Sequence, residues 1–427
     1  MPHIDRAIRL ASAAALAVLL GACGQPESTT EVQSAAPAAP TPELLPVTAI
    51  AFEGARLIVG DGSAPIESGT LVVDEGRFVA VGPSASVTVP EGAQRVDLRG
   101  TTVMPAIIDT HTHLSTEHDA LVADLRKRAT YGIGAAMSLG MDGTEDVLRV
   151  REEAAPGIAL YRTAGRGITT PEPGRTDVPH WVTTEEEARA AVREEAARDV
   201  DIIKVWVDDR NGQYERLSPP LFRAVIDEAH GLGLRVTAHI FGLEDAKELL
   251  RAGIDAFAHG VREQDIDDEF VALIRERPAV VLVPNLPARG VATDLEWLRG
   301  TLDDAQLQQL QNAPPGQPEV LDAFGIQARN LNRLSEAGVR IALGTDGNTP
   351  WGPHIEMEDM VAAGMSPMAV LTAATANGAA FMRLDDRGTL AGGKVADFIV
   401  LEADPLEDIT NTRRIREVYL AGTPVSR

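Results

Sequence analysis

The sequence predicts an α/β fold: a (β/α)8 TIM barrel with a small β-sandwich domain built from both ends of the mature chain. Three observations support this prediction. Eight short apolar runs alternate with amphipathic segments, a pattern typical of a parallel sheet covered by helices. Histidines, a lysine and an aspartate lie at the ends of several runs, where a barrel presents its reactive groups. Strand-like segments also precede and follow the eight runs.

The composition sets limits on the class of protein. The chain has 427 residues, 44% of them hydrophobic, which is enough for one large core and a smaller one and excludes global disorder. Its formal net charge of -24 repels nucleic acid and anionic lipid surfaces at long range. We therefore expect a small-molecule substrate and no nucleic-acid partner. The sequence leaves homo-oligomerisation open.

The first 22 residues predict a signal peptide. Arg6 and Arg9 precede the apolar run Leu10–Leu20, which is shorter than the roughly 20 apolar residues that span a bilayer. Leu20-Gly21-Ala22-Cys23 resembles the bacterial lipobox, which predicts lipidation at Cys23; an ordinary secretory signal is the alternative. Residues 23–46 would then be a lipidated cysteine and a flexible tether rich in proline and small residues. We expect an exported lipoprotein that faces the periplasm and touches a membrane only through this anchor, and Gly24 favours the outer membrane.

Residues 47–101 and 388–427 predict the small β domain. Residues 69–73 and 78–81 flank the turn Asp74–Arg77 and read as a hairpin. At the other end of the chain, residues 388–401 lead into a second strand at 418–420. The alternative is two unrelated β appendages.

Residues 102–387 predict the barrel. Thr184 with Glu187 makes a capping box before one helix, Ser218-Pro219-Pro220 opens another, and residues 243–252 form a third. Helical patterns of this kind separate the predicted strands, which are 103–113, 132–139, 157–164, 201–207, 235–240, 256–259, 279–286 and 340–346.

His111 and His113 are the first candidate metal ligands. Residues i and i+2 of a strand point to the same face, so both imidazoles can reach one ion inside the barrel. The spacing alone is weak evidence, because a chain with nine histidines produces such a pair by chance in roughly one case in five.

Lys204 lies in the apolar segment Ile202–Val207, where an ammonium group is costly to bury. One interpretation is an outward lysine whose stem runs between helices. The other is reaction with carbon dioxide to give N6-carboxylysine, whose carbamate can bridge two metal ions. The neighbouring ligand-type residues favour the carbamate.

His239, His259 and Asp346 end three later strand-like segments. Each histidine alone could equally be a core imidazole, and Asp346 alone could cap a turn. Six ligand-type residues on five strand ends are difficult to attribute to packing and capping. A metal-storage protein would more often use thiolates, and this chain has one cysteine.

These motifs resemble the amidohydrolase superfamily, and they include the segment Gly388–Asp397 (GTLAGGKVAD). Within it, the chain is similar to the imidazolonepropionase-like group that contains Xaa-Pro dipeptidases. Imidazolonepropionase itself uses one metal and lacks the carboxylated lysine, so the presence of Lys204 favours a binuclear site.

The resemblance implies a division of roles. The more buried metal would be held by His111, His113 and Asp346, and the more exposed one by His239 and His259. Carboxylated Lys204 and a hydroxide would bridge the two divalent ions, which are by default Zn²⁺. Asp346 would also act as general acid/base. In related dipeptidases a Tyr or His contacts the substrate carbonyl and a cation binds its carboxylate. By location His180 and Tyr214 suit the first role, and Arg166 or Arg210 the second.

Other polar residues after the strands could shape the pocket, and residues 287–318 could form a lid over it. The predicted activity is metal-dependent hydrolysis of C–N amide bonds in dipeptides or N-acyl amino acids. The alternatives are a lactonase or phosphotriesterase, a mononuclear deaminase or cyclic amidohydrolase, and a non-catalytic binding lipoprotein. The further pocket residues are Trp181, Asp208, Asp209, Asn285, Arg289 and His354.

Overall fold

The computed structural model describes residues 48–426, except residues 154, 290–292 and 313–317. The predicted signal peptide, Cys23 and the whole of the predicted tether lie outside the described residues. Among the helices that are described, none has the length and hydrophobicity to cross a bilayer.

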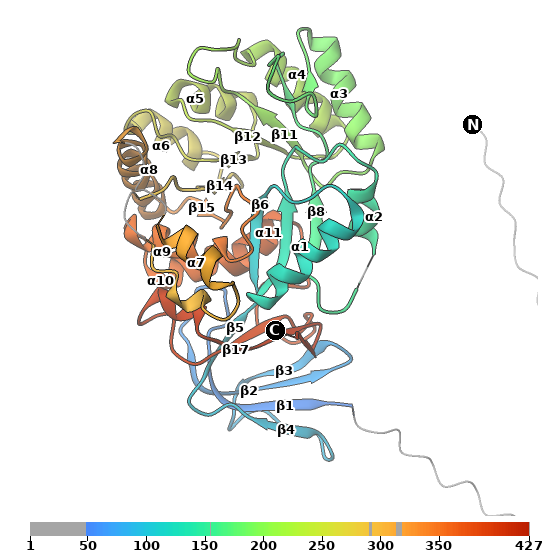
Figure 1. The fold of residues 1–427 in the computed structure, drawn as a ribbon, viewed down its shortest axis with the longest axis vertical. Coiled ribbons are helices and arrows are strands. Elements are labelled where there is room, and N and C mark those ends of the chain that lie inside the picture. The colour runs from blue at the N-terminus through green and yellow to red at the C-terminus, as the bar shows by residue number, and fades with distance from the viewer. Residues whose placement is uncertain (1–47, 154, 290–292, 313–317, 427) are drawn as a thin grey trace, which may run out of the picture. The chain divides into compact units, whose positions relative to one another are not determined.

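The larger part of the fold is a parallel barrel (Figure 1). Two sheets contribute to it, and backbone hydrogen bonds join them at both edges. Thr110 N–H donates to Leu343 O at 2.9 Å at one edge, and Asp201 N–H donates to Thr163 O at 2.9 Å at the other. The eight strands are β6 (Ile107–Thr112), β7 (Ile133–Ser138), β8 (Leu160–Thr163), β11 (Ile203–Trp206), β12 (Val236–His239), β13 (Ala256–Ala258), β14 (Val281–Val283) and β15 (Arg340–Ile341). The short strands β9 (Ile168–Thr169) and β10 (His180–Trp181) extend the sheet beside β11.

Helices cover the outside of the barrel, and their ends follow local sequence signals. Thr184 and Glu187 form both bonds of the predicted capping box at the start of α3. Gly253 ends α5 in the left-handed conformation, with φ +104°, which glycine adopts without steric cost. The helices are α1 (His118–Thr130), α2 (Asp146–Glu152), α3 (Glu185–Ala197), α4 (Pro219–Gly231), α5 (Leu243–Ala252), α6 (Asp268–Arg275), α7 (Asp304–Gln311), α8 (Pro318–Glu336), α9 (Gly352–Ala362), α10 (Pro367–Thr372) and α11 (Gly378–Phe381), with the short turns η1 (Glu296–Leu298), η2 (Ala373–Asn377) and η3 (Ile409–Arg413).

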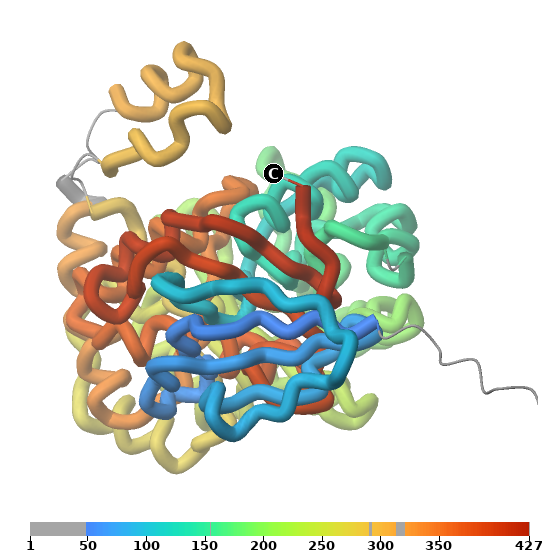
Figure 2. Tube along the Cα trace, turned by 90° about the horizontal axis from the view of Figure 1, so that it is seen from below, coloured from blue at the N-terminus to red at the C-terminus, as the bar shows by residue number. Residues whose placement is uncertain are grey.

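Strands from both ends of the described chain share one sheet (Figures 1 and 2). The sheet is curved, so that β3 approaches the segment before β16. Phe78 N–H, at the start of β3, donates to Lys394 O at 2.8 Å. Inside it Phe52, Phe398 and Tyr419 pack ring against ring. The strands are β1 (Ile50–Leu57), β2 (Ile66–Asp74), β3 (Arg77–Pro83), β4 (Gln94–Asp97), β5 (Thr102–Pro105), β16 (Phe398–Leu401), β17 (Ile415–Leu420) and β18 (Thr423–Pro424).

One predicted strand divides into two. Residues 103–113 were expected to form a single strand, but the structure breaks it at Ala106. β5 pairs with β16 in the sheet that both ends of the described chain share, whereas β6 pairs with β7 in the barrel. Ala106 N–H donates to Asp397 O, and the chain crosses from one sheet to the other at Ala106.

Candidate metal centre

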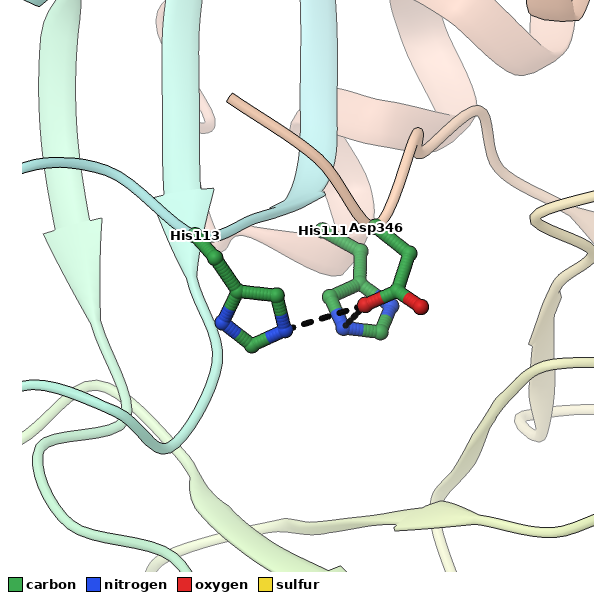
Figure 3. A group of neighbouring side chains, drawn as sticks. All are labelled: His111, His113 and Asp346. Carbon is green, nitrogen blue, oxygen red and sulfur yellow. Dashed lines mark hydrogen bonds and ion pairs between the residues drawn. The ribbon is translucent and has the colours of Figure 1, made fainter. Parts of the chain in front are cut away.

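His111, His113 and Asp346 form a compact group (Figure 3). Oδ1 of Asp346 lies 3.0 Å from Nε2 of His111 and 2.9 Å from Nε2 of His113. One potential ligand atom from each residue lies within 4.8 Å of the other two. The residues come together because Asp346 N–H donates to His111 O at 2.8 Å, which joins the end of the eighth strand to the end of the first.

Asp346 is held in an unusual backbone conformation and an ionised state. Its φ of +53° lies in the left-handed region, which side chains other than glycine adopt at a cost and often at functional sites. Burial alone would raise the pKa of its carboxyl group, but the charge and hydrogen bonds of His111 and the bond from His113 bring that pKa well below its usual range.

Lys204 is fully buried, which excludes the outward orientation. Its Nζ lies 3.4 Å from Nε2 of His111, and no carboxylate of the described residues lies within 4.0 Å of it. Burial lowers the pKa of Lys204 to about 7, with Asp346 opposing this shift and Arg210 adding to it. The amine is therefore neutral in a large fraction of molecules near neutral pH.

Lys247 shows how this chain treats a lysine with a structural role. Its side chain is also nearly buried, but Nζ lies 2.6 Å from Asp267, 2.9 Å from Glu269 and 3.1 Å from Glu244. The hydrogen bonds that its ammonium group donates to Asp267 and Glu269 raise its pKa. Lys204 lacks such partners, although it is the more deeply buried of the two.

His239 and His259 complete the cluster. Their ring centroids lie 4.6 Å apart, and the His259 ring lies 5.3 Å from that of His111. Burial is the main reason that the pKa of His239 falls to about 3 and that of His259 falls well below its usual value. His259 has a φ of +119°, so its strand ends in a strained conformation that turns the side chain.

The donor atoms suit divalent metal ions. Neither buried ring nitrogen of His259 has a hydrogen bond among the described residues, and Nδ1 of His113 is equally unpartnered. Such atoms are costly to bury unless a further group binds them. Neutral imidazoles and an ionised carboxylate are the ligands that Zn²⁺ takes in proteins, so the six residues fit a metal centre.

Two buried groups support the centre, and sequence reasoning gave neither of them this role. Oδ1 of Asn285 lies 2.9 Å from Nδ1 of His111. Asp109 lies 3.0 Å from Arg128 with both side chains fully buried, and it accepts a 2.9 Å bond from Thr345 Oγ1. Asn285 thus orients a candidate ligand directly, and Asp109 fixes the segment that carries Asp346.

The structure does not bring His180 or Arg166 to the cluster. Nε2 of His180 lies 2.8 Å from Glu195 of α3. Arg166 donates to Val178 O at 2.6 Å and lies 3.3 Å from Glu194. Both side chains therefore contact α3 and the loop before it, and the roles predicted for them remain untested.

Arg210 lies at the cluster, and Tyr214 lies on the same loop. Nη1 of Arg210 is 3.2 Å from Nε2 of His239, and Oδ2 of Asp208 is 3.1 Å from the same nitrogen. The Tyr214 hydroxyl donates to Pro173 O at 3.1 Å. A cavity of about 690 Å³ opens at His239 and is lined by Arg210 but not by Tyr214.

The segment predicted as a lid contacts other parts of the chain. The ring of Trp297 lies 6.1 Å from that of Tyr131 and 5.6 Å from that of His354. His354 lies 2.9 Å from Tyr131 O and 3.1 Å from Thr412 Oγ1, which makes it a packing residue. None of the described residues of 287–318 lines the cavity at His239.

Comparisons with known proteins agree with this architecture. The model of the amidohydrolase family matches residues 102–425. An imidazolonepropionase of Deinococcus radiodurans is 28% identical over 389 residues, 84% of this chain and 92% of the relative. An ochratoxinase of Aspergillus niger is 26% identical over 420 residues, 83% of this chain and 81% of the relative.

A solved structure from Bifidobacterium longum, named provisionally as a prolidase, superimposes with a TM-score of 0.75. It is 29% identical, and the alignment covers 90% of this chain and 96% of that one. Its fold, the family match and the strand-end residues agree with one another. The chain therefore belongs to the amidohydrolase family, and with that family it is a hydrolase that acts on carbon–nitrogen bonds.

Proposed function

We propose that this protein hydrolyses amide bonds in small substrates that carry a free carboxylate, such as dipeptides or N-acyl amino acids, with the help of two divalent metal ions. The observation that carries this proposal is the buried Lys204 amine beside His111. A neutral amine can add to carbon dioxide and release one proton to solvent, and the resulting carbamate would supply the anion that two cations in this cluster require.

The six residues would divide between the two ions. One ion would be held by His111, His113 and Asp346, and the other by His239 and His259. Carboxylated Lys204 would bind both ions. We take Zn²⁺ as the default because imidazole and carboxylate oxygen suit it. When bound, such a pair of ions activates water as a nucleophile and polarises the substrate carbonyl.

Asp346 is placed to move the proton. Its Oδ1 is occupied by the imidazoles of His111 and His113, whereas Oδ2 lies 3.5 Å from His259 and has acceptor capacity left. The side chain is 37% exposed, so a substrate can reach it. In our proposal Oδ2 takes the proton from the attacking water and passes it to the leaving nitrogen.

The dipeptide class is supported by the relatives and by charge. The Bifidobacterium longum structure carries the name of a prolidase. Arg262 lines the cavity at His239, and a cation there favours an anionic substrate. The ochratoxinase and imidazolonepropionase relatives show that other substrates belong to similar chains.

The test is a panel of dipeptides, N-acyl amino acids, lactones and phosphotriesters, offered to the zinc-loaded protein and to Asp346→Asn. We expect amide hydrolysis that falls by several orders of magnitude in the variant while its fold persists. Asp245→Asn, which removes a carboxylate that pairs with Arg216, is the matched control. Turnover of lactones or phosphotriesters alone would replace the proposal with the alternative activity.

We also propose export and anchoring through a lipid on Cys23, which the sequence pattern alone supports. Cells that express the full chain should incorporate a labelled fatty acid into the protein. Cys23→Ser should abolish the label and release the protein from the membrane fraction. Retention of the label in the variant would contradict this proposal.

A further inference from the structure

Arg262 differs from the other cations of the cavity. It lies three residues after His259, on the loop that follows β13, and its side chain lines the cavity at His239. Arg175 lies 2.5 Å from Glu172. Arg210 lies 3.0 Å from Glu172 and 2.7 Å from Asp208. These carboxylates neutralise both side chains.

Arg262 has no such partner among the described residues, because no carboxylate oxygen there comes within 4.0 Å of its guanidinium. The side chain is half-buried, and burial lowers its pKa. The carboxylates of Asp208, Asp346 and Glu263 attract this cation from beyond 4.0 Å and oppose the effect of burial only in part. A partly buried cation without a directly paired counterion is costly, which is a reason to look for an anion that binds it from outside the chain.

Phe241 fixes the position of Arg262. The guanidinium carbon lies 3.2 Å from the centroid of the Phe241 ring, and the backbone N–H of Arg262 donates to Phe241 O at 3.2 Å. The same ring lies 4.5 Å from that of His239 and 5.3 Å from that of His259. The cation is therefore one aromatic ring away from two candidate ligands, with one face covered and its N–H edge uncommitted.

We propose that Arg262 binds the carboxylate of the substrate and so determines the preference for substrates with a free carboxylate. This inference rests on the proposed function and deepens it. A guanidinium offers two parallel N–H donors to a carboxylate, and the stacking on Phe241 orients them before the substrate arrives. Arg262 takes the role that the sequence suggested for Arg166 or Arg210, whose guanidinium groups already pair with Glu194 or with Glu172 and Asp208.

The kinetic test compares a dipeptide with the same dipeptide carrying a C-terminal amide, in zinc-loaded wild type, Arg262→Gln and Arg175→Gln. A hydrogen-bonded charge contributes enough to change affinity by ~10-fold to ~100-fold. We expect Arg262→Gln to raise KM for the acid by this factor, to leave KM for the amide unchanged and to alter kcat little. Arg175→Gln should behave as wild type.

A binding measurement separates this inference from the proposed function. The affinities of L-proline and L-prolinamide for the same three zinc-loaded proteins are measured by titration calorimetry. Wild type and Arg175→Gln should prefer the carboxylate over the amide, and Arg262→Gln should lose that preference. Equal preference in wild type and Arg262→Gln would overturn the inference even if dipeptides are hydrolysed. Absence of dipeptide hydrolysis would overturn the proposed function, and the binding comparison would still decide the role of Arg262.

Discussion

Nδ1 of His111 lies 2.9 Å from Oδ1 of Asn285. An amide oxygen only accepts hydrogen bonds, so this contact favours the tautomer with the proton on Nδ1, whose Nε2 would offer its lone pair to a bound metal ion. Asn285 has a φ of +45°, and the next residue, Leu286, donates its N–H to Glu356 at 3.0 Å. The loop after β14 therefore favours the metal-binding tautomer of a candidate ligand on β6.

Asn285→Ala should weaken metal binding. Loss of the acceptor frees the His111 ring to rotate and to change tautomer, and loss of such a partner typically costs about 10-fold to 100-fold in metal affinity. Competition with a chromophoric zinc chelator measures the affinity. Asn332→Ala is the control, because the Asn332 side chain, among the residues that the structure describes, bonds only to Glu336 on the surface of α8. Equal affinities in the two variants would show that Asn285 does not orient the ligand.

Lys204 should give metal-free protein a distinctive dependence of stability on pH. Its pKa is about 7 in the fold and 10.5 as the reference value. Between these values the unfolded chain holds the proton and the folded chain does not, so the free energy of unfolding rises with pH in this window. Relative to Lys204→Met, wild type should gain on the order of 4 kcal/mol from pH 7 to pH 10.

Urea unfolding in buffers free of carbon dioxide measures this difference. Lys247→Met is the comparison, because the raised pKa of Lys247 keeps the native lysine protonated throughout the window. The free energies of unfolding of wild type and Lys247→Met should therefore change with pH in parallel. If the free energies of unfolding of wild type and Lys204→Met change with pH in parallel, Lys204 is not neutral in the folded protein.

Arg128 should stabilise the segment that carries Asp346, and the fold and metal content should depend on it. It forms a fully buried pair with Asp109 at 3.0 Å and donates to Gly347 O at 3.1 Å. Removal of one partner of a buried pair costs roughly 3–5 kcal/mol, because the other charge is left without compensation. Chemical unfolding of Arg128→Ala should show such a loss, together with lower metal content. The exposed Arg126 of the same helix provides the control, and a loss of equal size in Arg126→Ala would refute the specific role of the pair.

The sequence predicted the parts of the site that depend on periodicity. His111 and His113 alternate along one strand, and the other ligand-type residues end apolar runs that were already recognisable as strands. In a parallel barrel all such ends meet at one face, so the meeting of all six residues required no knowledge of the loops.

Loop geometry is what the sequence could not predict. Arg166 and His180 follow strands as ligand-type residues do, but Glu194 and Glu195 of α3 bind them. Asn285 was placed near the pocket without a role, because its contact with His111 depends on a positive φ that the sequence does not reveal. Arg262 passed unnoticed, since what distinguishes it is the lack of a carboxylate partner in three dimensions. The division of residues 103–113 at Ala106 was equally hidden in one continuous apolar run.

The central claim is a two-metal centre that depends on Lys204. Its most direct test is elemental mass spectrometry on protein lacking residues 1–23, produced with zinc and bicarbonate, beside Lys204→Ala and Lys247→Ala. We predict about two zinc ions per chain in wild type and in Lys247→Ala, and a clear fall in Lys204→Ala. One ion or none in wild type, or a content that Lys204→Ala leaves unchanged, would contradict the account.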